Sequence, residues 1–250
     1  MIIMQKAEPD KLIESIYKNI EIEDAKQPYR GYIGASSIGD ECELKLWLQY
    51  KKPELKKQKP ATTIMAANDG HRSEDLVASL IRQSPYNIEL TTHDSNGKQL
   101  GFSDLEGNYK GHWDGLILGI PQAPKTMHVW EHKAKNQKYY DALTKLKEKV
   151  PEKNVLEEWD YNYYCQGITY MHYSGTTRHY TTVALAGTRG LQSIRTNENP
   201  KLAIHLRDKA QRIINYISPP VGISTNPSFY KCKLCDFYNT CPSLNKNITL

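Results

Sequence analysis

Three cysteines lie within ten residues near the carboxyl end of the chain, in the run Cys232-Lys-Leu-Cys235-Asp-Phe-Tyr-Asn-Thr-Cys241, and Cys42 lies far upstream. Clustered thiolates are typical ligands of zinc or of an iron–sulfur cluster. With Cys42 as a fourth ligand, the metal would join the two ends of the chain. Zinc sites with four cysteines often contain two CxxC pairs, whereas this chain has one pair and two single cysteines. The spacing favours an iron–sulfur cluster, with structural zinc as the alternative.

A second set of reactive residues lies in the middle of the chain. Asp114 ends the run Gly-His-Trp-Asp, and Glu131 is separated from Lys133 by one residue. Residues two apart on a strand project from the same face of a sheet. Carboxylates bind a hard divalent cation that polarises a phosphate and activates water, and a lysine orients that water or neutralises developing charge. These residue types suit hydrolysis of a phosphodiester, although Glu-x-Lys alone occurs by chance in most proteins and, without supporting residues, would indicate a surface ion pair.

The helix expected at 66–83 carries a third acidic candidate. Glu74 falls at the edge of its buried side, whereas His71 and Asp75 point well away from that side. A carboxylate half turned to the core is costly unless a cation meets it, so Glu74 is expected to face the reactive residues. The buried side is defined by Leu76, Val77, Leu80 and Ile81.

A later helix carries two polar residues on one face. Gln166 and Tyr170 are four residues apart, so both can contact a single phosphate or base. Cys165 lies beside Gln166 without another cysteine nearby, and we expect it to be a core residue.

The expected elements alternate between helix and strand, which indicates an α/β fold. Asp114 precedes one strand of the expected sheet, and Glu131 and Lys133 lie near the end of the next. The patterns predict helices at 11–20, 66–83, 160–173 and 200–217, a short helix bearing Cys42, and strands within 89–120, at 116–120, 127–132 and 178–186.

The composition is that of a soluble globular protein. The 250 residues are 39% hydrophobic and 24% charged, and no apolar run reaches the length of a membrane span. We expect one domain in a reducing cytosol, where clustered cysteines bind metal rather than form disulfides. The net charge of +5 is compatible with nucleic acid. The basic residues include two lysine groups, Lys51, Lys52, Lys56, Lys57 and Lys59, and Lys133, Lys135, Lys138, Lys145, Lys147 and Lys149.

Taken together and in order, these motifs resemble the PD-(D/E)XK nuclease superfamily in its RecB-like branch. With the four cysteines added, the chain resembles the iron–sulfur members, which include the AddB nuclease domain, CRISPR-associated Cas-four type exonucleases and phage-encoded relatives. The resemblance spans about residues 31–242. It rests on Gly70-x-x-x-Glu74, Gly111-His-Trp-Asp114, Glu131-His-Lys133 and Gln166-x-x-x-Tyr170.

The resemblance implies a restriction-endonuclease-like α/β core with a central mixed sheet flanked by helices. Within one domain, 1–250, the catalytic core would span about 61–190, and a small iron–sulfur module would join about 31–55 to 225–245. The implied cofactors are a [4Fe-4S] cluster and Mg²⁺ or Mn²⁺, and the implied substrate is DNA.

Carried over by position, Glu74, Asp114 and Glu131 would be ligands of Mg²⁺ or Mn²⁺, and Lys133 would be catalytic. The same comparison makes Gln166 and Tyr170 substrate-positioning residues. Many family members have histidine in place of the first acid, so His71 stays open as the alternative to Glu74. The residue between Glu131 and Lys133 is often apolar in the family, and His132 is expected to point to the opposite face. Cys42, Cys232, Cys235 and Cys241 would hold the cluster.

We therefore expect a cytoplasmic metal-dependent DNA exonuclease, from a bacterium, an archaeon or a phage, that acts on single strands or frayed ends. Its role would lie in DNA recombination and end processing, as in phage recombination, or in CRISPR spacer acquisition. The alternative is a DNA-binding and processing subunit that acts mainly with an integrase or recombination partner and has structural zinc. The sequence leaves the polarity of digestion and the oligomeric state open.

Overall fold

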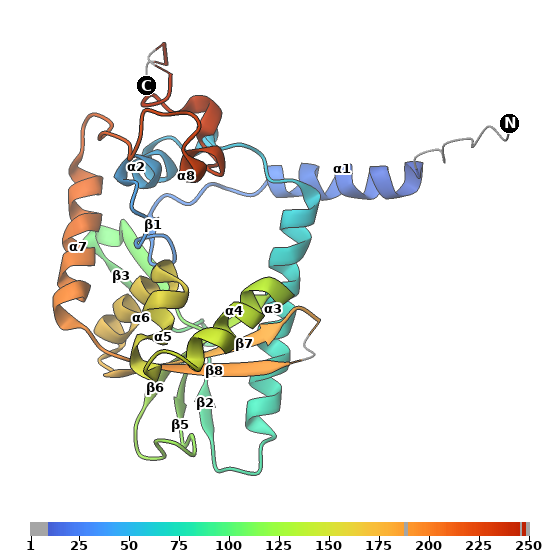
Figure 1. Ribbon diagram of the computed structural model, residues 1–250, viewed down its shortest axis with the longest axis vertical. Helices are drawn as coiled ribbons and strands as arrows, with labels where there is room; N and C mark the ends of the chain where they lie inside the picture. The colour runs from blue at the N-terminus through green and yellow to red at the C-terminus, as the bar shows by residue number, and fades with distance from the viewer. Residues whose placement is uncertain (1–9, 188–189, 246, 249–250) are drawn as a thin grey trace, which may run out of the picture.

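The computed structural model describes residues 10–187, 190–245 and 247–248, and these form a mixed α/β fold with two sheets (Figure 1). The larger sheet has five strands in the order β2-β5-β6-β7-β8. β6 and β7 run parallel, and every other neighbouring pair is antiparallel. The sheet is therefore mixed, as predicted. Its strands are β2 (Glu89–Thr91), β5 (Gly115–Leu118), β6 (His128–Lys135), β7 (Arg178–Leu185) and β8 (Leu191–Asn197).

The smaller sheet has the order β1-β4-β3, with β1 parallel and β3 antiparallel to the middle strand. It packs closely on a helix that follows β6. A Cβ atom at Gly111 would lie 2.6 Å from the Tyr170 ring and 2.8 Å from Ala35, so only glycine permits this approach. The strands are β1 (Ile33–Gly34), β3 (Gly101–Asp104) and β4 (Tyr109–His112).

Helices cover both faces of the five-stranded sheet. α3 packs Val77 and Ala78 against Trp130 of β6, while Leu143, Val155 and Ile168 of α4, α5 and α6 belong to the core on the other face. The parallel step from β6 to β7 requires such a helical crossover. The helices are α1 (Lys11–Ala25), α2 (Glu43–Lys51), α3 (Ala61–Arg82), α4 (Gln137–Lys147), α5 (Glu152–Trp159), α6 (Tyr161–Ser174), α7 (Pro200–Asn215) and α8 (Tyr230–Lys233), with 3-10 turns at Pro53–Leu55, Leu105–Gly107 and Tyr238–Thr240.

Several predicted elements are confirmed because local capping defines them. The Asp160 side chain accepts the backbone N–H of Tyr163 at the start of α6, and Gly175 ends that helix with a φ of 71°. Asn199 caps α7, and Pro200 occupies its first turn. The strand predicted at 178–186 is β7, and the one predicted at 127–132 is β6, which continues to Lys135.

The predicted buried side of α3 is wrong in part. Leu76 and Leu80 are 46% and 44% exposed, whereas Ser73 and Val77 are buried. The buried side of the helix runs through Ser73 and Val77, and the adjacent Glu74 is half-buried. Periodicity alone could not locate this contact, since Leu76 and Leu80 are as apolar as Val77. None of the described helices is long and apolar enough to cross a membrane.

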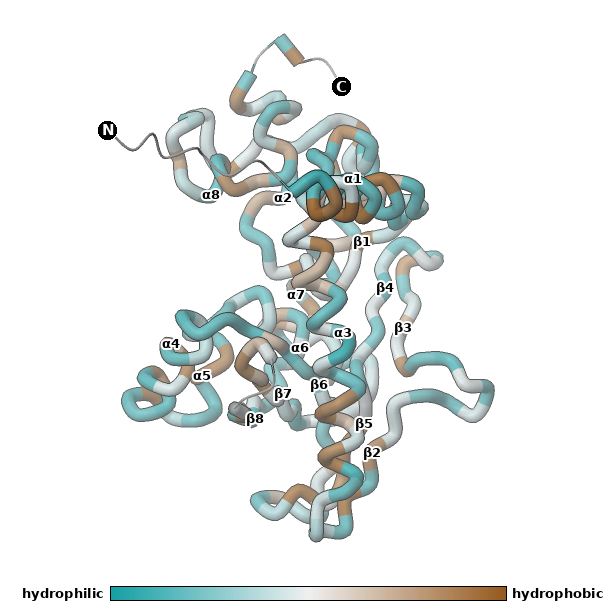
Figure 2. The backbone as a smooth tube through the Cα atoms, turned by 90° about the vertical axis from the view of Figure 1, so that its right-hand side faces the viewer, coloured by the Kyte–Doolittle hydropathy of each residue, from teal (hydrophilic) through white to brown (hydrophobic). Residues whose placement is uncertain are grey.

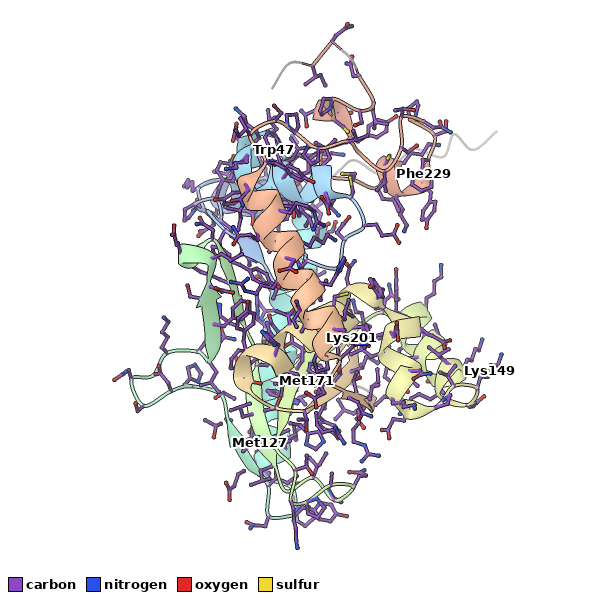
Figure 3. The ribbon with its side chains drawn as sticks, turned by 90° about the vertical axis from the view of Figure 1, so that its left-hand side faces the viewer. Trp47, Met127, Lys149, Met171, Lys201 and Phe229 are labelled. Atoms are coloured by element: carbon purple, nitrogen blue, oxygen red, sulfur yellow. The ribbon has the colours of Figure 1, made fainter. Side chains whose placement is uncertain are left out.

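α1 projects from the rest of the chain, and α3 is its main contact (Figure 1). The predicted helix at 11–20 therefore exists, but none of its residues is buried. Its apolar residues form a brown stretch in Figure 2. At the same end of the molecule, α2, with Trp47, lies near the carboxyl-terminal segment, with Phe229 (Figure 3).

Candidate active site and cysteine cavity

Asp114 is held against β6 by a backbone hydrogen bond. It directly precedes β5, whose first residue pairs with Trp130, and its Oδ2 accepts the backbone N–H of His132 at 2.7 Å. The side chain is only 8% exposed. Sheet register therefore places the Asp114 carboxylate beside Glu131 and Lys133, which flank His132.

Glu131 and Lys133 form a buried ion pair on one face of β6. Lys133 Nζ donates to Glu131 Oε1 at 2.6 Å, and the Glu131 residue is 4% exposed. Gln166 Nε2 on α6 donates to the same Glu131 oxygen at 3.1 Å and to the Tyr170 hydroxyl at 3.0 Å. The structure thus brings four of the predicted site residues into one hydrogen-bonded group.

These side chains and Glu74 line a cavity of about 810 Å³. His71 and Asp75 line it as well, although both were predicted to point away from the core. They are exposed at the surface of α3 but face this hollow, so Glu74 and His71 both stay candidates for the first metal ligand. Basic residues that the sequence reasoning missed, Arg30, Arg82 and Lys110, also line the cavity.

Burial and crowding of acids make the site unfavourable for negative charge without a cation. Burial raises the pKa of Glu131 to about 8, and the Asp114 carboxylate adds to the rise. Burial also raises the pKa of Glu74 to about 7, with contributions from Asp114 and Asp75. The pKa of Asp114 is raised by burial, which outweighs the nearby Lys133 ammonium and the His132 N–H. A divalent cation would remove this penalty by pairing with the deprotonated acids.

Lys133 stays protonated despite its burial. Burial by itself lowers the pKa of the ammonium group, but the carboxylates of Glu131 and Asp114 outweigh it and raise the pKa. The Tyr163 ring lies 4.8 Å from Lys133 Nζ, which adds a cation–π contact. Tyr163 is three residues before Gln166 on α6, and this spacing was the signal by which the sequence could have identified it.

Two buried oxygen atoms in the site have no hydrogen-bond partner among the residues that the structure describes. They are Glu131 Oε2 and Gln166 Oε1, and both are acceptors suited to a hard cation. Among the described residues, no group of three or more histidine, cysteine or acidic side chains is arranged to hold a metal ion. The unpaired oxygens and the raised pKa values fit a divalent cation, so the donor chemistry is suitable.

His132 lies on the opposite face of β6, as predicted. Its Nε2 and Nδ1 lie 2.9 Å and 3.0 Å from the hydroxyls of Ser73 and Thr182. Burial, with the nearby Lys133 ammonium, lowers the pKa of His132 to about 4. The imidazole is therefore neutral at physiological pH and links α3, β6 and β7.

The four cysteines of the predicted cluster line a separate cavity of about 360 Å³. Cys42 precedes α2, Cys232 lies in α8, and all are free of disulfides. Burial raises the pKa of Cys232, with contributions from Cys241 and Cys42. Four thiols around one hollow fit a soft metal, although they do not form a preorganised metal site among the described residues. Cys165 lies in the core, as predicted, and burial raises the pKa of its thiol to about 11.

Comparison with known proteins finds no protein family and no curated protein that matches the chain. Solved structures with a similar arrangement include SSO0001, at 15% identity and a TM-score of 0.49, covering 94% of this chain and 97% of that one. An alkaline exonuclease from Laribacter hongkongensis has 13% identity and a TM-score of 0.49, and the match covers 79% of this chain and 90% of that one. The structure of the same exonuclease in complex with dAMP has 14% identity and a TM-score of 0.46, and the match covers 74% of this chain and 86% of that one. At these scores the likeness carries no functional argument, which must come from the site itself.

Proposed function

We propose that this protein is a metal-dependent DNA exonuclease that hydrolyses phosphodiester bonds in single strands or frayed ends. The observation that carries the proposal is the buried group of Asp114, Glu131 and Lys133, joined to Gln166 and facing Glu74 across one cavity. The alternative interpretation, a surface ion pair, does not fit, because the Glu131 and Lys133 side chains are only 5% and 16% exposed and Glu131 Oε2 is buried without a hydrogen-bond partner among the described residues.

Asp114, Glu131 and either Glu74 or His71 would hold Mg²⁺ or Mn²⁺. When bound, such a cation polarises the scissile phosphate and lowers the pKa of water. Lys133 is protonated and lines the cavity. Its ammonium group would orient the attacking water or neutralise charge on the phosphate. Gln166 keeps Glu131 in place, and Tyr170 supports Gln166.

The cysteine cavity supports a structural role for a [4Fe-4S] cluster held by Cys42, Cys232, Cys235 and Cys241. Hydrolysis requires no electron transfer, so the cluster would stabilise the contact between the carboxyl-terminal segment and the region around α2. These features together favour the RecB-like branch of the PD-(D/E)XK superfamily. A role in DNA recombination or in CRISPR spacer acquisition, beside an integrase or recombination partner, agrees equally with this chemistry.

The experiment that tests the proposal measures release of nucleotides from labelled single-stranded DNA with Mn²⁺, using protein purified without oxygen. We expect Lys133→Ala and Glu131→Gln to lose activity while DNA binding persists. Lys201→Ala is the matched control, since this exposed lysine lies on α7 (Figure 3) and lines neither cavity. Full activity of the Lys133 and Glu131 variants would refute the site.

A further inference from the structure

The active-site cavity adjoins a second, basic cavity. The second cavity has a volume of about 680 Å³ and shares Arg30, Tyr32, Gly34 and Ser36 with the first. It extends toward the segment that links α2 to α3, where its lining includes Lys56, Lys57 and Lys59. The cavity that contains the carboxylates and the cavity that contains one of the two lysine groups therefore lie on either side of these shared residues.

The two cavities differ in charge. The first is lined by four acids, Glu74, Asp75, Asp114 and Glu131, and by four cations, Arg30, Arg82, Lys110 and Lys133. The second is lined by Arg30, Lys56, Lys57 and Lys59 but by only one acid, Asp24. The excess of cations makes the second cavity attractive to a polyanion even when no metal is bound.

The ion pairs of the lysines leave much of this charge available. Lys56 pairs with Asp236 at 2.9 Å, and Lys59 is 3.5 Å from Asp24. Within the described part of the chain, Arg30 and Lys57 have no carboxylate within ion-pair distance. Both are exposed, so they can bind phosphate without first breaking a contact.

Aromatic rings lie among these cations. Tyr29 is 63% exposed and lines the second cavity, and Tyr32 lines both cavities. Lys110 Nζ lies 5.4 Å from the centre of the Tyr32 ring. Exposed aromatic rings between cations are characteristic of surfaces on which unpaired bases stack while the phosphates contact lysine or arginine.

Long-range contacts fix the position of the lysine segment. Gln58 Nε2 donates to the Glu21 carbonyl oxygen, and the Ala61 N–H donates to the Glu21 side chain. On its other side, the Lys57 N–H donates to the Asp236 carbonyl oxygen, and Thr240 Oγ1 donates to that of Leu55. The segment is thus held between α1 and the cysteine-bearing segment, which lie at the same end of the molecule (Figure 1).

We propose that the second cavity, which Arg30 and Tyr32 separate from the carboxylates, binds the single strand of the substrate. Lys57 and Lys59 contact its phosphates, and Tyr29 stacks on one of its bases. The inference deepens the proposed exonuclease function, on which it rests for the identity of the ligand. Separation of the strands would follow from this path, because stacking on Tyr29 requires an unpaired base.

The test measures the binding of fluorescein-labelled oligothymidylate by fluorescence anisotropy over a range of salt concentrations. The buffer contains EDTA, so no hydrolysis is expected. Each lost lysine–phosphate contact should reduce the slope of log K against log salt by about 0.7 for a single strand. We therefore expect Lys57→Gln/Lys59→Gln to reduce the slope by about 1.4 and to bind about tenfold more weakly at low salt. Tyr29→Ala should bind at least about fivefold more weakly.

Two matched controls remove the same chemical groups elsewhere. Lys125→Gln/Lys201→Gln loses two exposed lysines that line neither cavity, and Tyr86→Ala loses a tyrosine that is 59% exposed. Lys57→Gln alone separates binding from folding. In the described part of the chain Asp236 pairs with Lys56 and Asp24 with Lys59, so this variant removes no ion pair. Wild-type affinity and salt slope in the Lys57/Lys59 variant, with its melting temperature unchanged, would overturn the proposal.

The outcomes separate this inference from the proposed function. Loss of hydrolysis in Lys133→Ala with unchanged DNA binding in EDTA would support the proposed active site. The role of the second cavity is decided separately, by the binding of the Lys57/Lys59 variant. Weaker binding by the Lys57/Lys59 variant, together with full hydrolysis by Lys133→Ala, would support the path and refute the site. Equal effects of the lysine variant on blunt duplex and on single strand would overturn the assignment to an unpaired strand.

Discussion

The Asp114 carboxylate accepts the backbone N–H of His132 at 2.7 Å, so an acid that precedes β5 is fixed to the middle of β6. Glu131 and Lys133 flank His132 and project to one face, while the His132 ring projects to the other. This hydrogen bond and the pairing of β5 with β6 therefore place the Asp114 carboxylate beside Glu131. It leaves the second Asp114 oxygen available to the cavity.

Replacing Asp114 with asparagine should weaken metal binding without unfolding the protein. The amide oxygen can still accept the His132 N–H, but the site loses a negative charge. We expect Mn²⁺ affinity to fall at least about 10- to 100-fold, the range found when even an outer-shell partner of a metal is removed. Titration calorimetry of the anaerobically purified protein measures this change. Asp141→Asn, at an exposed position on α4, is the control. Unchanged Mn²⁺ affinity in Asp114→Asn would exclude Asp114 as a ligand.

The stability of the protein without a divalent cation should fall as pH rises from about 4.5 to about 8. The folded-state pKa values of Glu74 and Glu131, about 7 and about 8, lie above the ordinary value of 4.5. The folded state therefore holds more protons than the unfolded state in this range, and stability is lost as these protons leave. If ionisation of Glu131 causes the loss, the melting temperature of Glu131→Gln should fall less over this pH range than that of wild type, because glutamine cannot ionise.

The same raised pKa values predict that metal binding strengthens with pH. Mn²⁺ must displace protons from Glu74 and Glu131, so its affinity and the hydrolysis rate should rise between about pH 6.5 and 8. Mn²⁺ should raise the melting temperature more at the upper end of this range. An affinity that does not depend on pH would show that these two acids are already ionised or do not bind the ion.

Replacing His132 with alanine should affect stability more than metal binding. The change leaves the hydroxyls of Ser73 and Thr182 without the imidazole and opens a gap between α3 and β6. The Thr182 hydroxyl keeps the hydrogen bond from the Trp130 indole N–H, whereas the buried Ser73 hydroxyl is left unpaired, which costs about 1–3 kcal/mol. Urea denaturation should detect this loss, and calorimetry should give nearly wild-type Mn²⁺ affinity. A large drop in metal affinity at unchanged stability would identify His132 as a ligand instead.

If the proposed cluster is present, replacing Cys235 with serine should remove its visible absorption and weaken binding of single-stranded DNA. The adjacent Asp236 accepts the Lys57 N–H and pairs with Lys56, so disorder around the thiol would release the lysine segment. Anaerobic visible spectra with iron and zinc analysis measure the first effect, and anisotropy in EDTA measures the second. Cys165→Ser, in the core, should retain the absorption. A colourless wild type with stoichiometric zinc would refute the cluster.

The elements set by local sequence agree with the structure. α6 and α7 have the predicted starts because Asp160 and Asn199 cap them. Alternation along β6 correctly places Glu131 and Lys133 on one face and His132 on the other. These features depend on residues a few positions apart, so a single sequence contains what is needed to predict them.

Contacts between distant segments decided the rest. The sequence could not show that Leu76 and Leu80 are exposed, that His71 and Asp75 face the cavity, or that Arg30 forms a wall shared by two cavities. The types and spacing of the acids, the lysine and the cysteines indicated a metal chemistry, while the tertiary structure decided which charges surround it. The physical reason is that burial and electrostatic interactions depend on distance in space, which the sequence sets only through the packing of the whole chain.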